Sequence, residues 1–308
     1  MSRIAILDLG TNTFNILITE NDATGYKQIY RDKHAVRLGQ GGIQKAFITP
    51  EAEQRAMDCL SDFQKIIQQN HVCTVKAFAT SAVRSAKNGK EFVSMIYDQF
   101  KIDVDVISGD REAALIWMGV QQAVDMPQKP SLIIDIGGGS IEFIIGNKDE
   151  IFWKQSFDLG ASRLLQQFAP ENPIHSSTKE AIESYLDSVL EALWENANHY
   201  KPEILIGSSG SFDTLADLIL NRFHNIESLD GTTSYIYDMK EYQLVSDAIL
   251  ASTTEERKQM KGMIEMRVDM MVIATIIVNF ILEKLSIQKM TLSTYSLKEG
   301  VLKTLLKQ

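Results

Sequence analysis

Runs of apolar residues separated by short polar stretches predict alternating strands and helices, and two of these stretches repeat one layout. Residues 4–18 and 132–146 each read as an apolar strand ending in Asp, a turn of small residues and a second apolar strand. The Asp is Asp8 in the first segment and Asp135 in the second, and a Gly follows two residues later in both. Each segment predicts a β-hairpin, and the matched pair indicates an internal duplication. We therefore predict an α/β fold of two duplicated domains with a cleft between them.

Segments between the predicted strands have apolar residues at helical spacing. Thr49 followed by Pro50 predicts a helix start, because Thr caps helix N-termini and Pro fits the first helical position. Ser177 and Glu180 have the spacing of a capping box and predict another start. The apolar stretch at 270–282 predicts a buried helix, since it is too short to span a bilayer.

A proline-containing segment, DMPQKP at 125–130, interrupts this pattern. It holds two of the six prolines of the chain and shows no hydrophobic periodicity, which is typical of a connection. We place the domain boundary there, so the predicted domains are residues 1–125 and 126–308.

Charge is distributed unevenly over the 308 residues. The net charge is −9, from 31 basic and 40 acidic residues, and residues 1–120 contain 14 of each. The whole negative balance therefore lies in residues 121–308. Without a global positive field, we expect no binding to nucleic acid or to an anionic membrane, and an anionic ligand requires a local basic cluster. No signal-peptide pattern opens the sequence, which predicts a cytoplasmic protein.

The two cysteines, Cys59 and Cys73, belong to no CxxC motif and have no His cluster nearby. This excludes a disulfide framework and a cysteine-based zinc site. We expect both thiols to be buried and reduced.

The turns of the two hairpins are candidates for phosphate binding, although ordinary hairpin turns remain the alternative. Glycine lacks a Cβ, so the backbone amides of the turn IGGGS can come close to phosphate oxygens. Ser140 adds a hydroxyl donor, and Asp135 at the strand end is placed to hold Mg²⁺ (or Mn²⁺), directly or through water. The candidates are Asp8, Gly10, Thr11, Asn12 and Thr13 in the first hairpin and Gly137, Gly138, Gly139 and Ser140 in the second.

Two glutamates are candidates for catalysis. Glu112 lies in the first turn of a helix predicted from about residue 110 to 123, where it either complements the helix N-terminus or directs a carboxylate at a water in the cleft. Glu142 lies two residues after Ser140, and strand alternation puts both on one face. A Glu in a strand of Ile and Phe needs either solvent, as at a sheet edge, or a partner such as a metal. We therefore predict Glu112 and Glu142 as catalytic and Glu142 also as a metal ligand with Asp135.

Basic side chains and a further Gly-rich turn complete the candidates. Arg84 in the segment 77–89 and Arg37, with Lys33 nearby, offer cations to phosphate oxygens; a solvated basic face is the alternative. The segment 204–220 predicts a strand, a turn and a helix whose N-terminus attracts anions. Its candidate residues are Gly207, Ser209 and Gly210. No GxxxxGK[ST] motif is present, which excludes a P-loop.

These segments resemble one known family. In order, DLGTNTFN, RLGQG, TSAVRSAKN, ISGDREA, DIGGGSIEF, LGASRL and LKEGVL are similar to the exopolyphosphatase and guanosine pentaphosphate phosphatase (Ppx/GppA) family of the actin-like ATPase superfamily. The resemblance implies two actin-like (ribonuclease H-like) domains, a Mg²⁺-dependent hydrolysis of the terminal phosphoanhydride of polyphosphate or pppGpp, and a possible homodimer. By motif position it implies that Glu112 is the catalytic carboxylate and Glu142 the second one. It assigns Asp135, Gly137 and Ser140 to the phosphate and magnesium loop and Arg84 to the substrate phosphates.

The chain also departs from the family pattern. GSSGS at 207–211 replaces a GTGGT-like turn, and Lys298 stands where Arg is common. Longer members carry a C-terminal helical domain, so we expect the short two-domain form and a preference for shorter polyphosphates.

Three other functions stay open at this point. A sugar or acetate kinase of the same superfamily would need an acceptor pocket with its own base. A sensor would bind polyphosphate or pppGpp without turnover, although Glu112, Glu142 and Asp135 are all present. An actin-like filament or chaperone is disfavoured because such chains are generally longer.

Overall fold

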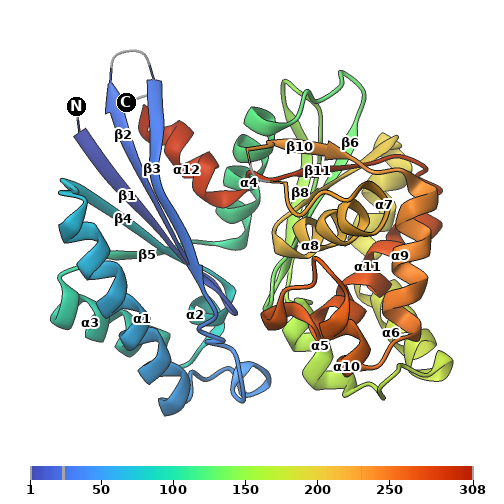
Figure 1. Ribbon diagram of the computed structural model, residues 1–308, viewed down its shortest axis with the longest axis horizontal. Helices are drawn as coiled ribbons and strands as arrows, with labels where there is room; N and C mark the ends of the chain where they lie inside the picture. Colours follow the sequence, from blue (N-terminus) through green and yellow to red (C-terminus); the bar gives the residue numbers. More distant parts are fainter. Residues whose placement is uncertain (1, 23–24, 230, 307–308) are drawn as a thin grey trace.

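The computed structural model describes residues 2–22, 25–229 and 231–306. Two β-sheets lie side by side, each with helices packed on it (Figure 1). We call them the N-terminal sheet and the C-terminal sheet.

The N-terminal sheet has the strand order β3-β2-β1-β4-β5. Strands β3, β2 and β1 form an antiparallel part of the sheet. Strands β4 and β5 continue the sheet parallel to β1. The strands are β1 (Ser2–Leu9), β2 (Phe14–Asp22), β3 (Gly25–His34), β4 (Thr74–Ala79) and β5 (Val104–Val106).

The C-terminal sheet repeats this arrangement. Its order is β10-β11-β9-β6-β7-β8, so β6, β7 and β8 correspond to β1, β2 and β3, and β9 and β11 run parallel in the places of β4 and β5. The predicted duplicated α/β fold is confirmed. The strands are β6 (Ser131–Ile136), β7 (Ile141–Gly146), β8 (Ile151–Phe157), β9 (Ile204–Ser208), β10 (Ser234–Ile236) and β11 (Met290–Ser293).

Helices cover the outer face of each sheet and bury a separate apolar core there. On the N-terminal sheet they are α1 (Pro50–Gln69), α2 (Ser81–Ser85) and α3 (Gly89–Phe100), with a short turn η1 (Ile43–Lys45). On the C-terminal sheet they are α5 (Ala161–Phe168), α6 (Ser176–Val189), α7 (Glu191–Tyr200), α8 (Gly210–Ile219), α9 (Met239–Ala251), α10 (Thr254–Gln259) and α11 (Met270–Lys284), with η2 (Leu220–His224) and η3 (Glu265–Arg267).

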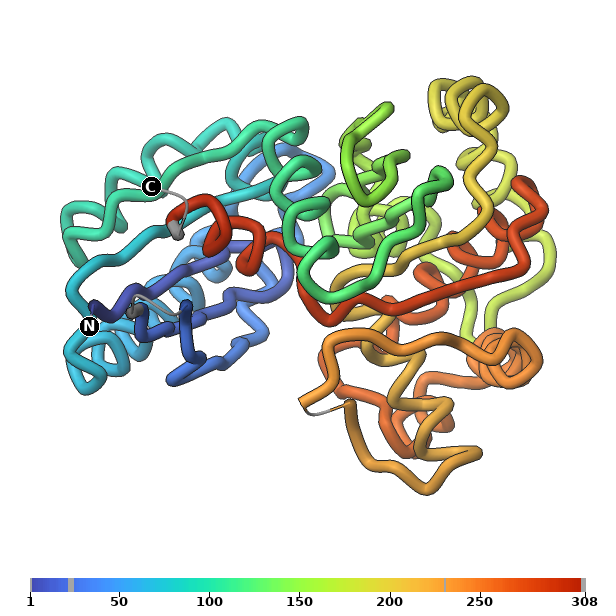
Figure 2. Tube along the Cα trace, turned by 90° about the horizontal axis from the view of Figure 1, so that it is seen from above, coloured from blue at the N-terminus to red at the C-terminus, as the bar shows by residue number. Residues whose placement is uncertain are grey.

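Two helices join the sheets. α4 (Gly109–Ala123) packs against α12 (Leu297–Leu306), β7 and β8, and α12 also reaches β1. Figures 1 and 2 show α12, in red, beside the N-terminal sheet, although it follows the last strand of the C-terminal sheet. Apolar side chains from both sheets and both helices form a central core, which includes Ile6, Leu17, Ile116, Val120, Ile133, Ile144, Ile206 and Val301.

This core ties the C-terminal helix to the N-terminal sheet. Residues 125–130 connect α4 to β6, and the division at 125/126 stays a prediction. The structure adds that α12, from the second predicted domain, packs on the first.

The local predictions had mixed outcomes. Thr49 caps α1, and its hydroxyl accepts from the Ala52 amide at 3.3 Å, as predicted. The capping box at Ser177 is wrong, because α6 begins one residue earlier, with His175 at its N-cap and no side-chain cap. Cys59 is buried, but Cys73 is exposed, so the expectation of two buried thiols is half wrong. The buried helix at 270–282 is confirmed as α11. Among the described residues, no helix is both long enough and apolar enough to cross a bilayer.

Candidate active site

A cavity of about 510 Å³ lies where the two hairpin turns meet. Most of the predicted site residues line it, and they come from both sheets. They are Asp8, Gly10, Thr11, Asn12, Thr13, Glu112, Asp135, Gly137, Gly138, Gly139, Ser140, Glu142, Ser209 and Gly210. The tertiary structure therefore gathers in one place side chains that are scattered over the whole sequence.

The two turns have the same geometry. We call residues 10–13 the first loop and residues 137–140 the second loop. The Gly10 amide donates to the Thr13 carbonyl at 3.1 Å, and the Gly137 amide donates to the Ser140 carbonyl at 3.0 Å. The duplication inferred from sequence thus extends to individual hydrogen bonds.

The loops also lie directly against each other. A Cβ on Gly138 would stand 2.3 Å from the Asn12 side-chain nitrogen, and one on Gly139 would stand 2.5 Å from the Thr11 hydroxyl. A larger residue at either position would displace the side chain of Asn12 or Thr11, so glycine lets the two loops approach with these side chains in place.

Backbone amides of α5 fix the second loop by donating to carbonyl groups of the loop. The first turn of α5 donates from Ala161 to the Gly137 carbonyl at 2.9 Å and from Ser162 to the Gly138 carbonyl at 3.0 Å. In the part of the chain that the structure describes, no acceptor is found for the amides of Gly138 and Gly139. These donors are consequently available to an anion in the cavity.

Glu112 enters the cavity from the first turn of α4. Its side chain is 7% exposed, and its carboxylate pairs with the Arg84 guanidinium at 2.8 Å. Burial and the nearby charge of Glu142 raise the pKa of Glu112 well above its ordinary value, and Arg84 opposes this shift. Arg84 thus reaches the site through Glu112 and is not itself among the residues that line the cavity.

Glu142 lies on an interior strand, since β7 is paired with β6 on one side and β8 on the other. The sheet-edge alternative is therefore wrong. The side chain is 1% exposed and accepts a 2.6 Å hydrogen bond from the Ser156 hydroxyl. Burial and the charge of Asp135 raise the pKa of Glu142 to about 7. A Cβ on Gly109 would touch Ser156, so the start of α4 sits against the group that binds Glu142.

Asp135 is held by two serines far away in sequence. Ser208 donates to its Oδ2 at 2.9 Å, and Ser296 donates to the same oxygen at 2.6 Å. Burial raises the pKa of Asp135, and the seryl hydroxyls oppose that shift. Its counterpart Asp8 accepts from Asn15 at 3.0 Å, and burial raises the pKa of Asp8 to about 6.

The buried carboxylates of the cavity are suitable ligands for a hard divalent cation, but they would supply only part of its coordination shell. Among the described residues, no three His, Cys, Asp or Glu side chains are grouped closely enough to hold a metal ion. Mg²⁺ commonly takes one or two carboxylates and completes its shell with water and phosphate oxygens. Asp135, next to Glu142 across β6 and β7, fits this habit.

Two more predicted residues, Arg37 and Gly207, lie outside the cavity lining, and a third, Gly210, lines the cavity but is already covered by a cation. The Arg37 side chain is exposed and outside the cavity lining, while its amide donates to the Asn12 carbonyl at 2.7 Å and so supports the first loop. Gly207 packs against the Phe212 ring. At Gly210 the guanidinium of Arg267 donates to the carbonyl, so a cation already covers the α8 N-terminus where we expected an anion.

The sequence reasoning missed several cavity residues. Arg31, Arg267 and Ser296 had no local motif to mark them, and Lys33 was only a secondary candidate. Lys298 was noted as a departure and given no role. The structure places Arg31, Lys33, Arg267, Ser296 and Lys298 in the cavity lining.

Known proteins resemble this chain in sequence and in fold. The sequence pattern of the Ppx/GppA phosphatase family matches residues 17–308. The chain is 45% identical to an exopolyphosphatase from Cytophaga hutchinsonii, with a TM-score of 0.97 over 99% of this chain and 98% of that one. A Ppx/GppA family member from Aquifex aeolicus, at 22% identity, shares the fold with a TM-score of 0.80 over 99% of this chain and 98% of that one.

One curated relative is longer. A bifunctional 3-dehydroquinate synthase/phosphatase from Fusobacterium nucleatum is 30% identical over 292 residues, which are 91% of this chain but only 43% of that protein. The chain thus spans less than half of the length of this relative. The predicted fold of two duplicated α/β domains agrees with that of the exopolyphosphatase from Cytophaga hutchinsonii, and the expected phosphoanhydride hydrolase is confirmed at the level of the family. The chain belongs to the Ppx/GppA phosphatase family.

Proposed function

We propose that this protein is an exopolyphosphatase, which releases the terminal orthophosphate of linear polyphosphate by attack of a water that Glu112 positions. The observation that carries the proposal is the meeting of the two hairpin loops with Glu112 in one cavity, where Glu112 is paired with Arg84. The relative from Cytophaga hutchinsonii, named as an exopolyphosphatase, supports this choice of substrate.

Phosphoryl transfer needs charge neutralisation and alignment more than a covalent nucleophile. The free amides of Gly138 and Gly139 bind the terminal phosphoryl oxygens, and Ser140 adds a hydroxyl. Glu112 orients the water and takes its proton, while Arg84 keeps the carboxylate turned into the cavity. A Mg²⁺ held by Asp135 and Glu142 would neutralise phosphate charge when bound.

The test compares phosphate release in Mg²⁺ buffer from short polyphosphate, long polyphosphate and pppGpp. Wild-type protein is expected to hydrolyse polyphosphate, with the higher kcat/KM for short chains. Glu112→Gln is expected to lower kcat by about 10²- to 10⁴-fold with little change in binding. Glu150→Gln, an exposed position beside β8, is the matched control and keeps full activity.

A second candidate is the 5′-phosphohydrolysis of pppGpp at the same loops. It is favoured by the extent of the cavity, which continues to Leu229, Gly231 and Thr232, beyond what a terminal phosphate occupies. Release from pppGpp alone would select this activity. Binding of all substrates without release would contradict both and select a sensor. Cytoplasmic location and a homodimer stay predictions.

A further inference from the structure

We propose that Lys298 binds the leaving phosphate of the substrate, and this proposal rests on the function proposed above. Lys298 is the second residue of α12 and lines the cavity. The feature that marks it is an ammonium group on a largely buried residue, for which the described residues supply no ion-pair or hydrogen-bond partner.

Lys298 is only 8% exposed. Within the described ranges, no carboxylate oxygen lies within 4.0 Å of its ammonium nitrogen, and no acceptor is within hydrogen-bonding distance. Other cations differ: the buried Arg257, 4% exposed, donates to the Val268 carbonyl at 3.0 Å, and the half-buried Arg84 donates to Glu112 at 2.8 Å. Burying an unpaired charge is unfavourable, so a protein keeps one where a ligand supplies the partner.

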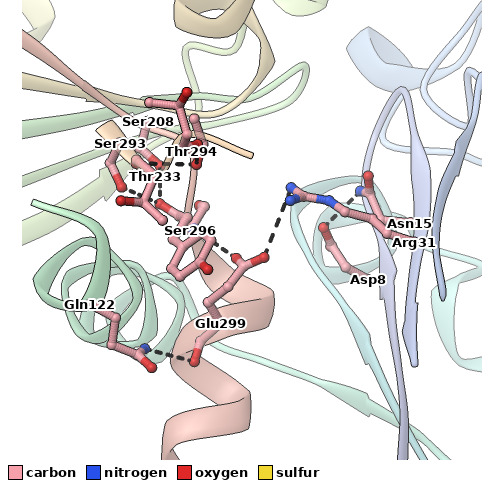
Figure 3. Close-up of polar contacts among 12 residues, drawn as sticks. Asp8, Asn15, Arg31, Gln122, Ser208, Thr233, Ser293, Thr294, Ser296 and Glu299 are labelled. Carbon is pink, nitrogen blue, oxygen red and sulfur yellow. Dashed lines mark hydrogen bonds and ion pairs between the residues drawn. The ribbon is translucent and has the colours of Figure 1, made fainter. Parts of the chain in front are cut away.

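The backbone at Lys298 is fixed from both sides. Ser296 donates its hydroxyl to Asp135 at 2.6 Å, and its amide donates to the Glu299 carboxylate at 2.9 Å. Gln122 of α4 donates to the Glu299 carbonyl at 3.0 Å. Figure 3 shows Ser296 and Glu299 at the start of α12, between α4 and the strand that carries Asp8. The side chain at 298 is therefore presented from a rigid position between the two sheets.

Lys298 acts on three carboxylates of the cavity. Its charge acts on Asp8, Asp135 and Asp213, and it is the strongest influence opposing the burial that raises the pKa of Asp8. Glu112 has a cation of its own, because Arg84 pairs with it at 2.8 Å. We therefore assign Arg84 to the carboxylate that positions the water and Lys298 to the next phosphate of a bound chain.

This position fits the charge that the reaction creates. The water oxygen forms a bond to the terminal phosphorus, and the bond from that phosphorus to the bridging oxygen breaks. One water proton goes to Glu112, and the other stays on the released orthophosphate. The electron pair of the broken bond remains on the bridging oxygen, which becomes the new end of the shortened chain. An ammonium with three donors stabilises this growing charge.

The test compares Lys298→Met and Lys298→Arg with wild type, using tripolyphosphate as substrate and ligand. Lys298→Met is expected to lower kcat/KM by about 10- to 100-fold, the loss of one charged hydrogen bond, and Lys298→Arg is expected to recover most of it. Without anion, the Tm of Lys298→Met is expected to change little, because removing an unpaired charge is offset by losing its attraction to Asp8, Asp135 and Asp213. The rise in Tm on adding tripolyphosphate is expected to shrink. Lys129→Met removes a surface lysine paired with Glu203 and serves as the control.

Each result has a distinct meaning. Unchanged kcat/KM and an unchanged tripolyphosphate-induced rise in Tm for Lys298→Met would overturn the inference and leave the proposed function standing. A lower Tm without anion, with no recovery in Lys298→Arg, would show a structural role and also overturn it. A wild type that binds tripolyphosphate without hydrolysing it would contradict the proposed function, and the rise in Tm would then decide whether Lys298 binds the anion. A wild type that does not bind tripolyphosphate would overturn both.

Discussion

Burial and neighbouring negative charges destabilise the ionised forms of Glu112 and Glu142 in the cavity. Glu112 and Glu142 are buried, and the charge of Glu142 raises the pKa of Glu112. Asp135 in turn raises the pKa of Glu142. Such repulsion destabilises the fold in the absence of a cation or substrate group that offsets it, and this is typical of functional sites.

This repulsion predicts a stability effect at Glu142. The ordinary pKa of this carboxyl is 4.5, and in the folded protein it is about 7. Between these pH values the folded state holds a proton that the unfolded chain has lost, so wild type loses stability as pH rises through the window. With EDTA present, Glu142→Gln is expected to have a higher Tm than wild type at pH 8 and a similar one at pH 4. A pH dependence of Tm identical to that of wild type would refute this, and Glu150→Gln is the control.

Arg84 is expected to set the pH range of activity. Its charge and hydrogen bond lower the pKa of Glu112 against the effects of burial and Glu142. In Arg84→Ala this charge is lost, so Glu112 stays protonated to higher pH. The acidic limb of the kcat–pH profile is therefore expected to shift to higher pH. Lys at this position keeps the charge and is expected to shift the limb less. An unmoved limb in Arg84→Ala would show that Glu112 does not act as the ionised base.

At the scale of elements, two glycines decide how closely α4 and α12 cross. A Cβ on Gly300 would stand 1.8 Å from the Leu115 carbonyl oxygen, and one on Gly119 would stand 2.0 Å from the Ser296 carbonyl oxygen. The helices can therefore cross this closely only if positions 119 and 300 carry no side chain. The crossing in turn fixes the position of the α12 residues that reach the cavity.

Gly300→Ala tests this crossing by the sign of its effect. In an exposed helix, Ala in place of Gly stabilises by about 0.5–1 kcal/mol. Here we expect the free energy of unfolding to fall by about 1–3 kcal/mol instead, because the helices must separate. Urea unfolding measures it, and a gain in stability would contradict the close contact.

At the scale of the molecule, the two halves are joined on both sides of the cavity. The central core with α4 and α12 forms one junction. At the other, the Ser162 hydroxyl donates to Asn12 at 2.8 Å, and Gln44 donates to the Arg163 carbonyl at 2.8 Å. Among the described residues, the apolar cluster that joins the two sheets lies at the first junction, and the second is held mainly by polar contacts, so the second is the one expected to open.

The double variant Ser162→Ala, Gln44→Ala tests this difference. Each hydrogen bond contributes about 0.5–1.5 kcal/mol, so their loss is expected to enlarge the radius of gyration measured by small-angle X-ray scattering. Tripolyphosphate is expected to restore compactness. The control pair, Ser188→Ala with Gln54→Ala, removes bonds made within α6 and α1. A radius unchanged from wild type would show that the central core alone holds the two halves.

The sequence alone determined the duplicated fold, the two loops and the carboxylates Asp8, Glu112, Asp135 and Glu142 of the cavity, and the family. Strand periodicity, glycine-rich turns and the Thr49 cap are properties of contiguous segments, and short-range stereochemistry decides them. The predicted roles of Glu112, Glu142 and Asp135 remain predictions, although all three lie in the cavity.

Only the tertiary structure decided which residues pair with the carboxylates of the cavity. Glu112 pairs with a residue 28 positions away, and Asp135 accepts from serines 73 and 161 positions away. The interior place of Glu142 depends on β8, and the presence of Lys298 in the cavity depends on the return of α12 to the N-terminal sheet. Such contacts arise from the packing of whole elements, and no local pattern of residues specifies them.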